Sequence, residues 1–147
     1  MTVFNVAQQN ASLDYKIVAG LERLSQVFRI LLLEKAKQFG LSPIQIQLLI
    51  FIKHHIADKC TISYLAQEFN FTKPTISDAI KVLEQKKMVK KITDPSDTRS
   101  YSIQLLANGK KVVAASEDFA NPLTAFIAQT GRNSKLILWQ NIVTLIK

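Results

Sequence analysis

The chain has 147 residues, the size of one domain, and 48% of them are apolar, which is enough for a buried core and excludes a disordered chain. Its formal net charge of +8 makes polyanions, such as nucleic acid or an anionic membrane surface, the first partners to consider. A single cysteine excludes an intrachain disulfide, and the N-terminal residues lack the features of a signal peptide. Because the longest apolar runs are far shorter than the ~20 residues that span a bilayer, we expect a soluble cytoplasmic protein without a membrane partner.

Most of the excess charge lies within residues 70–111. The basic residues of this segment are Lys73, Lys81, Lys86, Lys87, Lys90, Lys91, Arg99, Lys110 and Lys111, and the acidic ones are Asp78, Glu84, Asp94 and Asp97. Nine positive and four negative charges leave +5 in under a third of the chain. Such a concentration indicates a cationic surface patch.

The first predicted helix runs from about Ser12 to Phe39, because apolar residues recur there every three or four positions. We expect Gly40 to end it in a left-handed conformation. Its apolar stripe is wider than one small neighbour can cover. Ser42 opens a second helix, since serine is a common N-cap and Gln45 can reach back to form a capping box.

Two short helices joined by about three residues come next. The first runs from about Thr61 to Phe69, and Asn70 is expected to end it with a positive φ angle. Thr72 caps the second. Its inner face carries Ile76, Ala79, Ile80 and Leu83. Because its outer face is polar and cationic, the pair is typical of a helix-turn-helix.

The remaining elements complete a winged helix-turn-helix. Strands are predicted from Val89 to Thr93 and from Tyr101 to Leu105, with a loop over residues 94–100. A β-hairpin directly after a helix-turn-helix is a wing. A helix over residues 108–130, broken or kinked at Asn121-Pro122, and a last helix from Asn133 or Ser134 follow. The predicted fold class is therefore mainly α with a small β-hairpin wing, in a single domain over residues 1–147.

This order of elements resembles the MarR (multiple antibiotic resistance regulator) family of bacterial transcription factors, over essentially the whole chain. The wing reads Asp94-Pro95-Ser96-Asp97-Thr98-Arg99, which fits the family pattern Asp-Pro-x-Asp-x-Arg, and the stretch FTKPTISDAIKVLEQKKMV has the apolar spacing of its recognition helix. The resemblance implies a DNA-binding core over residues 42–106. It also implies a two-fold homodimer, built from helices over 1–40 and 108–147, that binds double-stranded DNA.

The resemblance further suggests a ligand-responsive repressor on a near-palindromic operator. Three departures from the family pattern bear on structure or DNA reading. Leu106 stands where the family usually has threonine, so a helix cap is missing. Lys87 stands where glycine is usual, and Asp78 stands where arginine is common.

A recognition helix enters the major groove with its N-terminal end. This places Lys73, Thr75, Ser77, Asp78 and Lys81 against DNA. The lysines would neutralise phosphate or reach guanine, and the hydroxyls would bond to bases or phosphate. Asp78 could accept a hydrogen bond from cytosine N4 or pair with a neighbouring lysine. The alternative is a solvated polar face without a partner.

The wing and the third helix supply further candidates. The resemblance places Arg99 in the minor groove, where negative potential favours arginine, and the alternative is a surface pair with Asp97. Asp97 and Asp94 would structure the wing. Lys90 and Lys91 point to opposite faces of one strand, and we assign Lys90 to phosphate and expect the other to be solvated. Ser63, with Lys59 and Thr61, lies at a helix N-terminus that can bind anions.

No catalytic residue, metal ligand or cofactor is expected, since none of the common catalytic motifs occurs and adjacent His54 and His55 point about 100° apart on a helix. Cys60 is read as a small buried side chain rather than a redox sensor. The effector pocket cannot be assigned. Its candidates, each with core packing as the alternative, are Tyr15, Phe28, Phe39 and Phe51. The alternative function is a winged-helix protein-interaction module that has lost operator reading, which Asp78 motivates.

Overall fold

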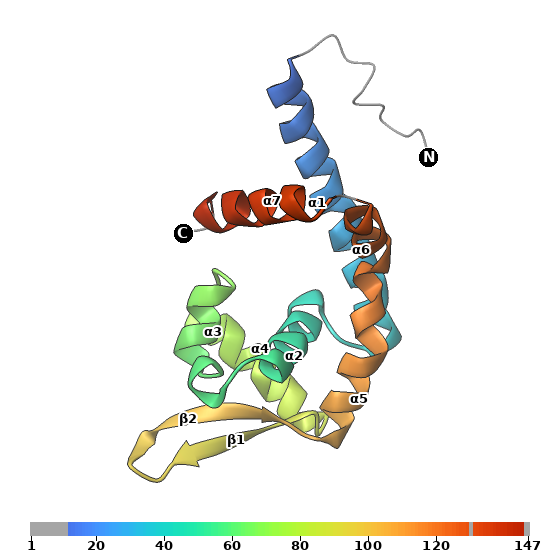
Figure 1. Ribbon diagram of the computed structural model, residues 1–147. Coiled ribbons are helices and arrows are strands. Elements are labelled where there is room, and N and C mark those ends of the chain that lie inside the picture. Colours follow the sequence, from blue (N-terminus) through green and yellow to red (C-terminus); the bar gives the residue numbers. More distant parts are fainter. Residues whose placement is uncertain (1–11, 130, 146–147) are drawn as a thin grey trace. The chain divides into compact units, whose positions relative to one another are not determined.

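The computed structural model describes residues 12–129 and 131–145, except for the side chains of residues 94, 97–100, 120, 122, 123, 126 and 145. The chain forms two compact units, Met1–Glu117 and Asp118–Lys147. The first unit contains α1 (Leu13–Gln38), α2 (Pro43–His54), the short 3-10 helix η2 (Ala57–Lys59), α3 (Ile62–Glu68), α4 (Lys73–Gln85), β1 (Val89–Asp94), β2 (Asp97–Leu105) and α5 (Ala107–Ser116) (Figure 1). A 3-10 helix η3 (Glu117–Ala120) leads into α6 (Asn121–Ala128) and α7 (Arg132–Leu145) of the second unit. This order of elements confirms the predicted fold class, mainly α with a small β-hairpin wing, whereas the single domain over residues 1–147 remains a prediction.

The ends of α1 form as the sequence predicts. At its start, the Ser12 hydroxyl accepts a hydrogen bond from the Tyr15 N–H at 3.3 Å. At its end, Gly40 has a φ angle of 61°, and the Leu41 N–H turns back to donate to the Ala36 carbonyl at 3.0 Å. Glycine adopts this left-handed conformation without a steric cost, so the chain reverses directly into α2.

The starts of α2 and α4 are also capped by their own side chains. The Ser42 N–H donates to Gln45 Oε1 at 2.9 Å, which is the reaching-back half of the predicted capping box. The Thr72 hydroxyl accepts from the Thr75 N–H at 3.3 Å. Asn70, between α3 and α4, has a φ angle of 53°, as predicted for the terminator of α3. Local chemistry therefore fixes the helix-turn-helix boundaries.

The first unit has its own hydrophobic core. α2 lies at its centre and packs against α1, α4, α5 and β2, while α3 packs against α4. The largest fully buried side chains are Ile46, Leu48, Leu49, Leu65, Ile76, Ile80, Leu83, Val89, Ile103 and Val113. Burying one such side chain contributes about 1.5–3 kcal/mol relative to leaving it exposed. The winged helix thus completes its core within one chain.

The hairpin is longer than predicted. Asp94 pairs with Asp97, so the turn uses only Pro95 and Ser96, and the expected loop over residues 94–100 is wrong in extent. Proline presets the backbone for the second position of such a turn, which lets the flanking residues pair. Thr93 pairs with Tyr101, so residues 98–100 of β2 have no partner on β1 and form an irregularity in the register.

The chain after the hairpin differs slightly from the prediction. Leu106 occupies the N-cap of α5 and makes no side-chain cap, as its replacement of threonine implies. Gly109 is buried one turn later, where a Cβ would overlap the Met88 carbonyl oxygen, so only glycine fits. The helix breaks at Glu117, where a 3-10 helix begins, ahead of the predicted position at Asn121-Pro122. Pro122 does not cause a break, because it lies in the first turn of α6, where proline is well accommodated. The last helix begins at Arg132.

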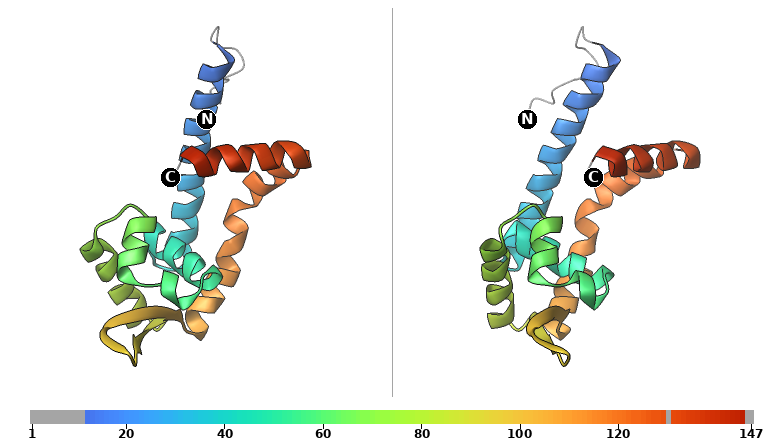
Figure 2. Two further views of the ribbon diagram at one scale, coloured as in Figure 1. Left: turned by 60° about the vertical axis from the view of Figure 1, so that its left-hand side comes forward. Right: turned by 90° about the vertical axis from the view of Figure 1, so that its left-hand side faces the viewer.

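The described part of α1 leaves most of its apolar stripe uncovered. Leu32 and Ala36 are its buried residues. Its exposed large apolar side chains, 41–72% exposed, are Leu13, Tyr15, Ile17, Val18, Leu21, Leu24, Val27, Ile30 and Leu33. In both views of Figure 2 the N-terminal half of α1 projects beyond the cluster of α2, α3 and α4.

The second unit likewise exposes apolar side chains on α7. They are Leu136, Ile137, Leu138, Trp139 and Ile142. None of the helices in the described ranges combines the length and apolar character needed to cross a membrane. Large exposed apolar surfaces of this kind are common at protein–protein contacts.

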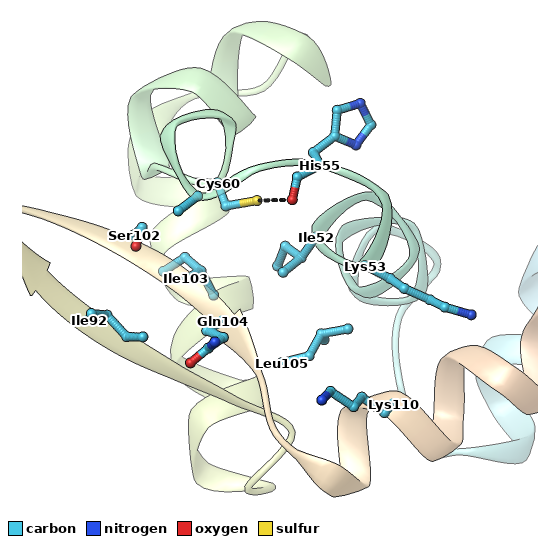
Figure 3. A pocket seen from close by; sticks show the side chains of 11 residues that line it. Ile52, Lys53, His55, Cys60, Ile92, Ser102, Ile103, Gln104, Leu105 and Lys110 are labelled. Carbon is cyan, nitrogen blue, oxygen red and sulfur yellow. Dashed lines mark hydrogen bonds between the residues drawn. The ribbon is translucent and has the colours of Figure 1, made fainter.

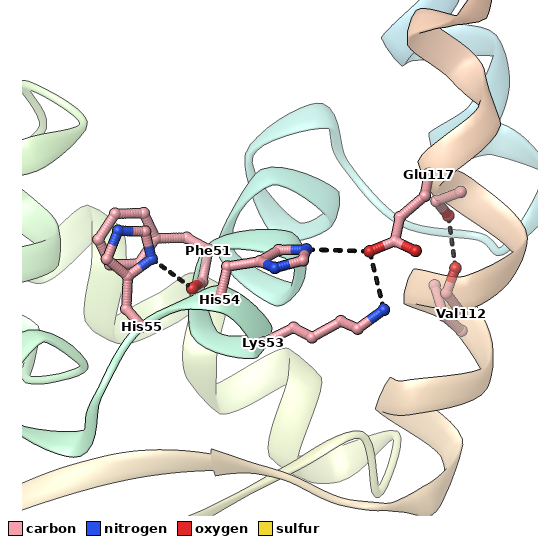
Figure 4. Close-up of polar contacts among 7 residues, drawn as sticks. Phe51, Lys53, His54, His55, Val112 and Glu117 are labelled. Carbon is pink, nitrogen blue, oxygen red and sulfur yellow. Dashed lines mark hydrogen bonds and ion pairs between the residues drawn. The ribbon is translucent and has the colours of Figure 1, made fainter.

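A charged cluster ties α2 to the end of α5. Glu117 Oε1 lies 2.8 Å from Lys53 Nζ and 2.9 Å from His54 Nε2 (Figure 4). Hydrogen bonds from Lys53 and then His54 hold the pKa of the Glu117 carboxyl below its ordinary value. A group with a lowered folded-state pKa stabilises the fold above its unfolded pKa and loses that effect as the pH falls through the folded value.

Replacing Lys87 by glycine should raise the free energy of unfolding by about 0.5–1 kcal/mol, because Lys87 has a φ angle of 55°, which strains a residue that carries a Cβ. Urea denaturation measures the effect. The matched control is Lys86→Gly, since Lys86 has a φ angle of −80° and gains nothing from glycine. A Lys87→Gly protein no more stable than the wild type would contradict the strain.

Replacing Glu117 by glutamine should lower the thermal midpoint at pH 7 by a small amount, because the exposed carboxylate loses its attraction to Lys53 and His54. The difference from the wild type should shrink at acid pH, below the lowered pKa of the Glu117 carboxyl, where the wild-type carboxyl is itself protonated. The control is Glu68→Gln on α3. An equal difference at both pH values would show that charge is not the cause.

Candidate nucleic-acid interface

One face of α4 is buried and the opposite face is polar and open to solvent. The inner positions, which pack against α2, α3 and β1, are Ile76, Ala79, Ile80 and Leu83. On the outside, Lys73, Thr75, Asp78 and Lys81 are exposed and Ser77 is half-buried. Burial of the apolar positions therefore brings the five predicted α4 residues to one surface.

The N-terminal turn of this face is internally ordered. Thr72 Oγ1 lies 2.8 Å from Thr75 Oγ1, so the two hydroxyls share a hydrogen bond in addition to the cap. A hydroxyl carries one donor and two acceptor positions, which leaves Thr75 with capacity for a further partner. The cap thus orients Thr75 without using up its hydrogen bonds.

Three ionic groups on the outer face of α4 have no ion pair within the described part of the chain. Among the side chains that the structure describes, none forms an ion pair with Lys73, Asp78 or Lys81. The pairing of Asp78 with a neighbouring lysine is therefore not observed within that part of the chain. All three groups are exposed and available to an external partner.

The two hairpin lysines have different environments. Lys91 Nζ lies 3.0 Å from Glu84 Oε2 and 5.0 Å from the centre of the Tyr101 ring. Lys90 lies opposite Gln104 on the other face and is exposed. The expectation of a merely solvated second lysine is thus wrong for Lys91, since the inward face of β1 is turned toward α4 and Glu84. The alternation of side chains along the strand could have predicted on which face Lys91 lies, but not that Glu84 is its partner.

The wing residues assigned from the family pattern are placed only by their backbone. Arg99 lies in β2 among the residues without a partner on β1, and Asp94 and Asp97 flank the two-residue turn. Their side chains fall outside the described part of the structure. Their roles therefore remain predictions.

Three candidates for phosphate binding lie at or just before the start of α3. The Thr61 hydroxyl is the N-cap and accepts from the Tyr64 N–H at 3.2 Å. Lys59 Nζ lies 4.4 Å from the centre of the Tyr64 ring. Ser63 is exposed in the first turn of α3. Thr61 and Lys59 thus have structural roles, and Ser63 remains the phosphate candidate.

The cysteine and the two histidines serve packing or local bonding. Cys60 is buried, and its thiol lies 3.9 Å from the His55 carbonyl. Burial raises the pKa of the Cys60 thiol, which disfavours the reactive thiolate. His55 stacks on Phe51 with ring centres 3.6 Å apart, whereas His54 turns to Glu117, so the histidines diverge as predicted (Figure 4).

The chain is similar to known winged-helix proteins. A protein-family model described as "MarR family" matches residues 39–100, from the end of α1 to β2. The Staphylococcus aureus MepR–DNA complex is 23% identical, with a TM-score of 0.71, and the match covers 93% of this chain and 98% of that one. S. aureus MepR in its DNA-binding conformation is 23% identical, with a TM-score of 0.80, and the match covers 88% and 96%.

A further similar structure is a MarR transcriptional regulator from Methanosarcina mazei Go1, at 22% identity and a TM-score of 0.69. That match covers 88% of this chain and 97% of that one. The sequence matches no curated protein. At these identities the similar structures establish the fold, and the family model matches the helix-turn-helix and the first part of the hairpin.

Proposed function

We propose that the chain is a winged helix-turn-helix regulator of the MarR family, which the family model over residues 39–100 supports, and that it binds double-stranded DNA as a homodimer and represses transcription. The observation that carries the proposal is the exposed face of α4. Lys73, Thr75 and Lys81 lie there, next to a hairpin with an exposed Lys90, and no side chain in the described part of the chain forms an ion pair with either of these α4 lysines. Cationic side chains on a helix of this size match the charge and width of the major groove.

The uncovered apolar side chains support the homodimer. α1 and α7 both present such side chains to solvent, and a second copy of the chain offers matching faces. In a two-fold dimer the two copies of α4 would lie about one helical turn of DNA apart, ~34 Å. A site of that spacing is near-palindromic, because the two readers are identical.

A cavity between α1 and α2 supports a small-molecule effector. It has a volume of about 430 Å³ and is lined by Ser25, Phe28, Arg29, Leu32, Leu33, Pro43 and Gln47. Of the four aromatic candidates, Phe28 lies in this lining, whereas Phe51 packs against Phe69 with ring centres 5.5 Å apart. A ligand in this cavity would contact the long helix of the proposed dimer and the central helix of the winged core. Repression would weaken if the ligand preferred a second arrangement of the two.

Replacing Lys73 or Arg99 by alanine should weaken binding to the DNA flanking the protein's own gene. It should also reduce the slope of the logarithm of the binding constant against the logarithm of the salt concentration by about 1 for each phosphate that the side chain neutralises in the wild type. Footprinting and binding titrations at several salt concentrations measure both effects. The control is Lys37→Ala, an exposed lysine on α1. If the wild type ignored DNA even in dilute buffer, the protein-interaction alternative would replace DNA binding.

Replacing Asp78 by alanine should raise affinity for unrelated DNA, because a negative charge leaves a surface that faces phosphate. It should also relax discrimination at one base pair by about 1–3 kcal/mol, if the carboxylate accepts from cytosine. Binding to operators that differ at single positions measures the second effect. Equal weakening on every sequence would contradict base reading by Asp78.

A further inference from the structure

The winged core leaves few large apolar side chains in water. Among the described residues from 41 to 117, the exposed ones are Ile56, Phe71 and Ile92, at 67%, 47% and 39%. Ile92 lines a cavity of about 440 Å³ beside Lys110, between α2, β2 and α5 (Figure 3). Ile56 follows α2 and lies outside the helix-turn-helix. Within the described helix-turn-helix, residues 62–85, Phe71 is therefore the exposed large apolar side chain.

The backbone on both sides of Phe71 is fixed by hydrogen bonds. The Asn70 N–H donates to the Gln67 carbonyl at 3.2 Å. The Phe71 N–H donates to the Ala66 carbonyl at 2.9 Å, so the two bonds together form a Schellman motif at the end of α3. Thr72 follows directly as the N-cap of α4. Phe71 is thus held at a defined position, one residue before the N-cap of the helix with the cationic face.

Packing within the chain accounts for only part of the Phe71 ring. The residue at this position of a Schellman motif commonly packs on the last turns of its own helix, which would account for the buried part. The remaining 47% of the residue is open to solvent. Contact of this part with another apolar group would remove it from water and contribute favourable free energy.

The exposed ring lies at the end of α4 that a recognition helix inserts into the major groove. Every residue from Phe71 to Thr75 is exposed, and the buried positions begin at Ile76. Lys73 has no ion pair within the described part of the chain. A phosphate contact by this lysine would hold the start of α4 against the duplex, where side chains reach base edges.

Thymine is the base that an apolar side chain can recognise in the major groove. Its C5-methyl group projects into the groove, whereas the other three bases present polar groups and no methyl group there. A phenyl ring has no hydrogen-bonding group, so Phe71 can distinguish bases only through such an apolar contact. Thr75 also carries a methyl group on this face, and a test therefore has to separate the two side chains.

We propose that Phe71 reads a thymine by packing its ring against the C5-methyl group of that base in each half of a two-fold operator. The inference rests on the proposed DNA binding and adds a base that the operator has to contain. The exposed lysines of α4 attract any duplex through its phosphates, whereas Phe71 selects sequences with thymine at one symmetric pair of positions.

The test replaces thymine by deoxyuridine, which removes the C5-methyl group and leaves the base pair intact. The substrate is the site that the wild type protects in the DNA flanking its own gene, with each symmetric pair of thymines replaced in turn. At one pair, deoxyuridine should weaken wild-type binding by about fourfold for each half-site, as expected for one buried methyl group. In Phe71→Ala the same replacement should have no effect. The salt slope of Phe71→Ala should equal that of the wild type, because no charge is lost.

Control variants separate this contact from other causes. Thr75→Ser removes the threonine methyl group and keeps the hydroxyl, so it should retain the deoxyuridine effect. Ile56→Ala, at an exposed apolar position outside the helix-turn-helix, should also retain it. Urea denaturation shows whether Phe71→Ala unfolds cooperatively. If it does not, Phe71→Leu takes its place and should reduce the deoxyuridine effect, because leucine lacks the outer ring carbons.

Three results would overturn the inference. They are equal binding of thymine and deoxyuridine operators by the wild type, a deoxyuridine effect that persists in the folded Phe71 variant, and loss of the effect in Thr75→Ser. In each case the wild type still binds DNA, so the proposed function stands. A wild type that protects no DNA would overturn both proposals together.

Discussion

One constraint governs this molecule. α1 is a 26-residue helix with apolar side chains along its length, and Leu32 and Ala36 are the α1 residues that the described chain buries. Burying apolar surface stabilises a protein by about 25 cal/mol for each Å² removed from water, and the exposed part of α1 does not contribute this stabilisation. The winged core cannot supply the missing contacts, since α2 already fills its centre. A second copy of the chain can supply them, and its placement would then fix the distance between two recognition helices.

The same burial principle shapes the surface that we propose faces DNA. Ile76, Ile80 and Leu83 turn one side of α4 into the core, which forces the cationic side outward. The number of free cations is nevertheless limited, because Glu84 neutralises Lys91. Because Asp78 also lies on the exposed side, this face would attract phosphate less strongly than the net charge of +8 suggests.

The sequence was sufficient where short-range chemistry decides the structure. The cap at Ser12, the left-handed Gly40 and the capping box that includes Gln45 involve residues three or four positions apart, so spacing alone predicts them. It was insufficient where distant segments meet. Glu117 bonds to residues more than 60 positions earlier, and the cavity beside Lys110 depends on how β2, α2 and α5 pack. Periodicity carries no information on such contacts. The sequence could therefore predict which side chains lie on the exposed face of α4, but not which side chains form ion pairs with each other.

Sedimentation equilibrium of the full chain at micromolar concentration, in the absence of DNA, tests pairing through α1 and α7 most directly. Burial of both exposed faces predicts a particle of twice the 16.6 kDa chain mass. A single species of 16.6 kDa under the same conditions would contradict it. The apolar stripe of α1 would then require a different partner.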